Sequence, residues 1–178
     1  MDAGELARQT AADLHAQAVV LGVDPWRPYE FAVAEARRRG LDVEAAAVGA
    51  AVLDGGRAVF VPRDRLILHE NVGTLFDRAF LIAHELGHVE LGDDPSDHAP
   101  CEIDPTRSAE PAPVGVDRVI DYGRRQRREV QMDLFAREFL LPRAVVRRLY
   151  LQDGLTANVI ATRLGAPFDV VAQQLFDA

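Results

Sequence analysis

Two histidines and a glutamate near the middle of the chain have the spacing of a metal-dependent hydrolytic site. The stretch His84-Glu85-Leu86-Gly87-His88 contains the pattern His-Glu-x-x-His. On a helix both imidazoles project from one face about one turn apart, which suits two ligands of a single zinc ion. Glu85 leaves the helix about 100° around from His84. It can therefore reach a water molecule on the metal without being a ligand, as a general base must.

The residues around this motif favour a buried helix. Apolar side chains recur at spacings of three and four between Leu75 and Val89. Thr74, followed three residues later by Asp77, is typical of a helix N-terminus. Because so apolar a helix packs into the protein interior, we expect its two histidines to enter an internal cleft and not a solvated face.

A catalytic zinc ion usually keeps three protein ligands and one open position, so a third ligand must lie elsewhere in the chain. The extended pattern His-Glu-x-x-His-x-x-Gly-x-x-His is absent, because Leu91 and Asp94 occupy the positions of its Gly and last His. His98 is one alternative. Glu129 is the better candidate, because a predicted helix places it on the same face as another carboxylate.

That second carboxylate is Asp133, four residues after Glu129. A carboxylate at this spacing can hydrogen-bond to a ligating imidazole and fix its tautomer and orientation. We therefore expect His84, His88 and Glu129 to be the metal ligands, and Asp133 to orient His84.

Composition excludes several classes of protein. The chain has 178 residues and a net charge of −8, which argues against a general affinity for nucleic acid or for an anionic membrane. No apolar run approaches a membrane span, and the N-terminus lacks a basic segment followed by an apolar core. The single cysteine, Cys101, cannot form an internal disulfide. We expect a cytoplasmic protein with no membrane partner.

The rest of the chain predicts an α+β fold. Four short apolar runs, with a turn at residues 54–57, predict a small, largely antiparallel sheet; they are Leu41–Ala46, Ala50–Leu53, Ala58–Val61 and Arg65–His69. Further helices are expected at residues 3–21, 29–39, 124–141, 143–150, 156–164 and 167–176. We expect the sheet to pack against a helical core that carries the His-Glu-x-x-His helix. This unit spans residues 1–142, and residues 143–178 form a C-terminal helical appendage.

Residues 93–123 interrupt the helical pattern. They are rich in proline and acidic residues and show no periodicity, which predicts a mobile insertion. A basic block, Arg118 to Arg128, follows the acidic part. The insertion contains Cys101, for which two interpretations stay open. It is either an exposed thiol or a thiolate that occupies the open metal position.

Two motifs together resemble the ImmA/IrrE family of metallopeptidases. The first is Arg78-x-Phe80-x-x-Ala83-His84-Glu85-Leu86-Gly87-His88. The second is Glu129-x-x-x-Asp133-x-Phe135-Ala136, followed by Leu140-Leu141-Pro142. The family has Ala-Asn where this chain has Met132-Asp133, and Asp accepts a hydrogen bond from an imidazole at least as well as Asn does. The stretch between the motifs is longer than is usual in the family.

The resemblance implies a gluzincin-like endopeptidase that uses zinc and tolerates manganese. It assigns the ligand role to His84, His88 and Glu129 and the base role to Glu85. Its implied substrate is a helix-turn-helix repressor, cleaved as a stress or phage-defence switch. Similar domains occur in UvrD-like helicases, and the tail of this chain resembles the join in such fusions. Tyr122, His98 and His69 are candidates for a second oxyanion donor.

Two other functions remain open at this point. The chain could be a non-catalytic module that keeps the fold and binds a partner protein. It could also be a DNA-responsive sensor, because residues 156–165 echo the first half of a helix-turn-helix and the Arg118 to Arg128 block is basic. The presence of Glu85 favours the enzyme, because a binding module has no need of it.

Overall fold

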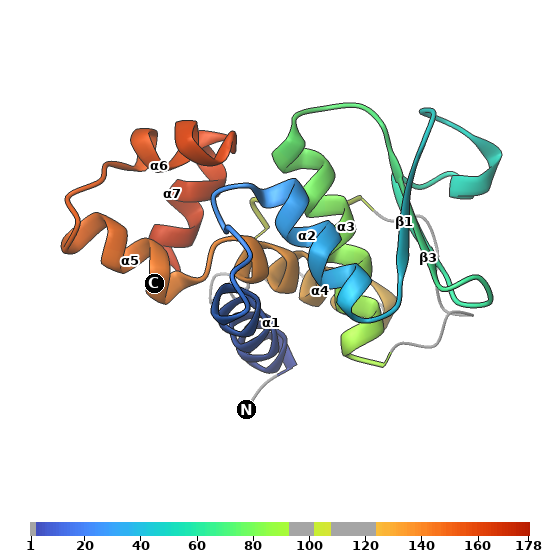
Figure 1. The fold of residues 1–178 in the computed structure, drawn as a ribbon, viewed down its shortest axis with the longest axis horizontal. Coiled ribbons are helices and arrows are strands. Elements are labelled where there is room, and N and C mark those ends of the chain that lie inside the picture. Colours follow the sequence, from blue (N-terminus) through green and yellow to red (C-terminus); the bar gives the residue numbers. More distant parts are fainter. Residues whose placement is uncertain (1–2, 93–101, 108–123) are drawn as a thin grey trace, which may run out of the picture.

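The computed structural model describes residues 3–92, 102–107 and 124–178 (Figure 1). Within these residues the chain forms seven α-helices, a short 3-10 helix and three strands, so the fold is α+β as predicted. Their order is α1 (Ala3–Val20), α2 (Pro28–Arg38), β1 (Asp42–Ala46), η1 (Ala51–Leu53), β2 (Ala58–Val61), β3 (Leu66–Glu70), α3 (Leu75–Glu90), α4 (Arg124–Leu140), α5 (Arg143–Leu151), α6 (Ala157–Leu164) and α7 (Phe168–Phe176). The sheet lies at one end of the molecule and α5–α7 at the other, with α3 and α4 between them.

The sheet is mixed, and the prediction of a largely antiparallel sheet is wrong in this respect. The strand order is β1-β3-β2, with β2 antiparallel and β1 parallel to β3. The hairpin turn lies between β2 and β3, where Arg65 has a φ of 49°, and not at residues 54–57. The β2–β3 hairpin leaves the other edge of β3 free, and β1 pairs there in parallel after a longer connection.

The apolar run Ala50–Leu53 was also expected to be a strand, and it is not. Residues Ala51–Leu53 form η1, which ends at Asp54 in the left-handed conformation with a φ of 48°. Leu53 is buried, whereas Val52 is 60% exposed. The run therefore buries one side chain in a turn and does not pair with the sheet.

The helix that carries the histidines begins as predicted. The Thr74 side chain accepts a hydrogen bond from the Asp77 backbone N–H at 3.1 Å, and the Asp77 carboxylate accepts one from the Thr74 N–H at 2.8 Å. This reciprocal capping box satisfies two backbone donors that a helix start leaves unpaired. From Phe76 to His88 nearly every side chain of α3 is buried, because α2, α4 and the sheet pack around it.

α3 is in close contact with α4 at Gly87, which lies between the two histidines in the sequence. A Cβ atom at this position would lie 3.0 Å from the Met132 sulfur and 3.0 Å from a ring carbon of Phe135. Both neighbours are fully buried on α4. The missing side chain of Gly87 therefore allows the α4 backbone, with Glu129 and Asp133, to come close to the histidine face of α3.

The C-terminal helices belong to the same hydrophobic cluster as the rest of the chain. Val146, Ile160 and Val171, one from each of α5, α6 and α7, are buried in it. The Arg163 guanidinium lies 3.9 Å from the centre of the Trp26 ring, which joins α6 to the turn before α2. Among the described residues, no helix has both the length and the apolar character needed to cross a membrane.

We predict that Gly87→Ala destabilises the protein. In an exposed helix this change would stabilise by about 0.5–1 kcal/mol, because alanine has the higher helix propensity. Here the added methyl group meets a packed phenylalanine ring, and overpacking of this kind costs about 1–3 kcal/mol. Urea unfolding of the metal-free protein measures the difference. A gain in stability would show that α3 and α4 are not in close contact at this position.

Candidate metal centre

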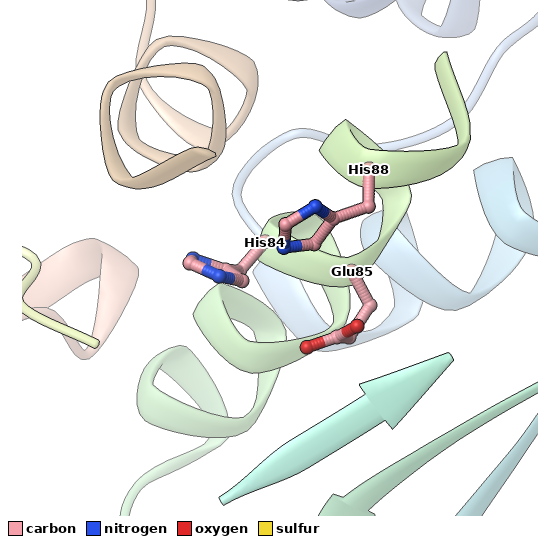
Figure 2. A group of neighbouring side chains, drawn as sticks. All are labelled: His84, Glu85 and His88. Atoms are coloured by element: carbon pink, nitrogen blue, oxygen red, sulfur yellow. The ribbon is translucent and has the colours of Figure 1, made fainter. Parts of the chain in front are cut away.

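The two histidines of the motif project from α3 toward α4. His84 and His88 are 1% and 5% exposed, and their ring centres are 5.1 Å apart. Figure 2 shows both rings on one side of α3, whereas Glu85 leaves the helix in a different direction, toward the sheet. The metal-binding atoms of His84, Glu85 and His88 all lie within 4.8 Å of one another. The structure therefore brings together the three residues that the His-Glu-x-x-His pattern singled out.

Glu129 reaches the same place from α4. One carboxylate oxygen lies 3.1 Å from His84 Nε2 and the other 3.8 Å from His88 Nε2. Ligand atoms at bond lengths of about 2.0–2.1 Å around a tetrahedral zinc ion lie about 3.3 Å apart. The two nitrogen–oxygen separations, 3.1 and 3.8 Å, lie on either side of this ligand–ligand distance. The Glu129 carboxylate thus lies close to both imidazole nitrogens between the helices, and these separations are compatible with ligands that share one metal ion.

Asp133 contacts the opposite nitrogen of His84. His84 Nδ1 donates to Asp133 Oδ1 at 2.9 Å, and the Asp133 carboxylate is fully buried. This hydrogen bond fixes the ring so that Nε2 points toward Glu129, as a metal ligand shared with Glu129 would require. The arrangement is the one expected from the four-residue spacing of Glu129 and Asp133.

Burial lowers the pKa of both histidines, whereas nearby carboxylates raise it, and the balance differs between the two. Burial alone would lower the pKa of His84, but hydrogen bonds to Asp133 and Glu129 and the charges of Asp133 and Glu85 raise it to about 10. Burial is the main cause that lowers the pKa of His88. Near neutral pH these shifts favour an imidazolium at His84, between two carboxylates, and a neutral ring at His88 in the metal-free protein.

His69 was a candidate for a second oxyanion donor, and its hydrogen bonds argue against that role. Its Nδ1 lies 2.7 Å from the Glu70 carbonyl oxygen and must donate to it. Nε2 then accepts from the Tyr29 hydroxyl at 3.3 Å. Burial lowers the pKa of His69, so the ring stays neutral and has no second N–H to offer a substrate. The other candidates, His98 and Tyr122, lie outside the described residues, as does Cys101.

Part of the expected insertion packs against the site. Residues 102–107 lie against α4, where Ile103 is buried. The Asp133 oxygen that faces away from His84 accepts from the Asp104 N–H at 3.2 Å and lies 3.1 Å from Arg107 Nε. Sequence reasoning missed both residues, because a stretch without periodicity gives no sign of what it contacts. It also missed Gly87, although a glycine inside a helix usually has a packing reason.

No protein-family model matches the chain, and a search of curated proteins finds no similar sequence. The resemblance to ImmA/IrrE peptidases therefore depends on the two motifs quoted above. The geometry of the site is a separate argument for metal binding, because it depends on distances between side chains and not on sequence similarity.

We predict that His84 carries two ring protons in the metal-free protein at about pH 8. Its pKa rises on folding from 6.5 to about 10. Its contribution to stability is therefore complete below pH 6.5 and is lost as the pH rises through about 10. Long-range ¹H–¹⁵N NMR of the imidazoles measures the charge directly, with neutral His88 as the control in the same spectrum. A neutral His84 at this pH would contradict the pairing with Asp133 and Glu129.

Proposed function

We propose that this protein is a zinc-dependent endopeptidase whose metal is held by His84, His88 and Glu129. The observation that supports it best is the approach of the Glu129 carboxylate to both Nε2 atoms, at 3.1 and 3.8 Å. Two imidazoles and one carboxylate are a common ligand set of catalytic zinc. Nitrogen donors also favour zinc over magnesium or calcium, which prefer oxygen. Three protein ligands leave one coordination position for a reactant.

The position of Glu85 supports a role as the general base. Zinc bound at this site would acidify a water molecule and polarise a peptide carbonyl. The Glu85 carboxylate, 5% exposed and within 4.8 Å of the imidazoles, can take a proton from that water and pass it to the departing amine nitrogen. Asp133 holds a proton on His84 Nδ1, so that Nε2 would be the nitrogen that binds the metal. These groups together perform hydrolysis of an amide bond.

The edge of the sheet offers a place for an extended substrate. β2 is an outer strand, and α3 packs against it. Within the described residues no strand pairs with the outer edge of β2. Its backbone N–H and C=O groups can therefore bind a peptide in β conformation, which is how many proteins capture an extended chain. This supports cleavage within a polypeptide segment that is already unfolded or extended.

The motif resemblance suggests the identity of the substrate. Relatives of this kind cleave a helix-turn-helix repressor encoded nearby, and we propose the same class of substrate here. Cleavage would remove the repressor and switch on a stress or phage-defence response. The competing function, a non-catalytic binding module, leaves the buried carboxylate of Glu85 without a purpose, although burying such a group costs free energy.

We predict that Glu85→Gln keeps the metal and loses hydrolysis. The amide has nearly the shape of the carboxylate but cannot accept the proton, so the rate should fall by about 10²–10⁴-fold. The assay uses the zinc-loaded protein with helix-turn-helix repressors encoded beside its gene and with a peptide library. Glu90→Gln is the matched control, because Glu90 lies on the same helix and pairs with Arg39.

Three results would contradict parts of this proposal. Equal cleavage by Glu85→Gln and wild type would remove Glu85 as the base. Loss of metal from Glu85→Gln would make Glu85 a ligand. Metal binding by wild type without cleavage of any substrate would favour the binding module.

A further inference from the structure

We propose that Arg107 is a positioning residue for the metal site, acting through Asp133 on His84. This inference rests on the metal site proposed above. Arg107 Nε lies 3.1 Å from Asp133 Oδ2, while Asp133 Oδ1 accepts from His84 Nδ1 at 2.9 Å. The two oxygens of one carboxylate therefore connect the guanidinium to the imidazole. No feature of the two family-like motifs points to Arg107, which lies between them in the sequence.

The backbone around Arg107 is folded into a compact turn. The Asp104 carboxylate accepts from the Thr106 N–H at 2.8 Å and from the Thr106 hydroxyl at 2.7 Å. The Arg107 N–H donates to the Asp104 carbonyl at 3.2 Å, and the Arg107 side chain donates to the Glu102 carbonyl at 2.8 Å. This turn presents the Asp104 N–H and the Arg107 guanidinium to the same carboxylate oxygen of Asp133.

Arg137 fastens the turn to α4. It lies four residues after Asp133, hence on the same helix face, and is only 1% exposed. One of its nitrogens donates to the carbonyl oxygens of Pro105 and Arg107, at 3.1 and 2.6 Å. Its other two nitrogens donate to Gln174 and Asp177 near the C-terminal end of the chain, at 2.8 and 2.5 Å. Arg137 is thus immobilised by α7 and holds Arg107 in register with Asp133.

The charge balance explains why this contact matters for metal binding. Asp133 is fully buried, and a buried carboxylate must be compensated. With zinc bound, His84 is neutral and offers Asp133 only a neutral N–H. Arg107 then supplies the full positive charge beside Asp133. Without it, the carboxylate would turn toward water, and the hydrogen bond that orients His84 would weaken.

The test compares zinc affinity, measured by chelator competition, in wild type and Arg107→Gln. Loss of a residue that supports a ligand from behind typically weakens metal binding by about 10–100-fold, and we expect this range. Arg143→Gln is the matched control. Arg143 has the same side-chain exposure as Arg107, 24%, and likewise pairs with a buried carboxylate, but this carboxylate is Glu138, five residues after Asp133 on α4. Its zinc affinity should equal that of wild type.

A double-variant cycle separates positioning from general destabilisation. If Arg107 acts through Asp133, then Arg107→Gln added to Asp133→Asn weakens zinc binding by less than 2-fold beyond Asp133→Asn alone. Solvent exchange of the His84 Nδ1 proton, measured by NMR in the metal-free protein, should also accelerate in Arg107→Gln and not in Arg143→Gln. Arg107→Lys, which keeps the charge, should recover most of the zinc affinity. It takes the place of Arg107→Gln in the comparison with wild type if the glutamine variant does not fold.

The outcomes distinguish this inference from the proposed function. Zinc binding by wild type with unchanged affinity in Arg107→Gln would overturn the role of Arg107 and leave the metal site standing. Additive losses in the double variant would overturn it as well, because the two residues would then act independently. Failure of wild type to bind any divalent metal would overturn the metal site and, with it, this inference.

Discussion

The packing of α4 against α3 determines whether this protein has a metal site. Each helix contributes a pair of polar side chains four residues apart, His84 with His88 and Glu129 with Asp133. Neither pair alone can enclose an ion, because one helix face supplies ligands from one side only. Gly87 removes the side chain that would hold the helices apart at this level. The contacts of Glu129 and Asp133 with the histidines therefore depend on the distance between the two helix backbones.

Burial then sets the electrostatic balance of the site. His84, His88, Glu129 and Asp133 are at most 6% exposed, so their charges cannot be neutralised by water. In the metal-free protein a proton on His84, together with Arg107, offsets the nearby carboxylates. A divalent cation can replace that proton and contribute one further positive charge. The same set of groups thus allows a folded metal-free state and would favour a bound cation.

Sequence reasoning anticipated the parts of this arrangement that have local signals. The apolar periodicity and the Thr74–Asp77 pair predicted α3. The spacing of Glu129 and Asp133 predicted that both carboxylates approach His84. The parallel pairing of β1 with β3 was missed, because strand order depends on contacts between distant segments. The docking of residues 102–107 was missed for the same reason, since it depends on Arg137, thirty residues away from Arg107.

Metal content and zinc affinity of purified wild type, beside Glu129→Ala and His84→Ala, test most directly whether the two helices form one metal site. We expect about one zinc ion per chain in wild type and loss of binding in both variants, because each removes one of three ligands. Zinc retained at wild-type affinity without Glu129 would show that α4 does not supply the third ligand. In that case the approach of Glu129 to the two imidazoles would be a structural hydrogen-bond contact, and the third metal ligand would lie elsewhere in the chain.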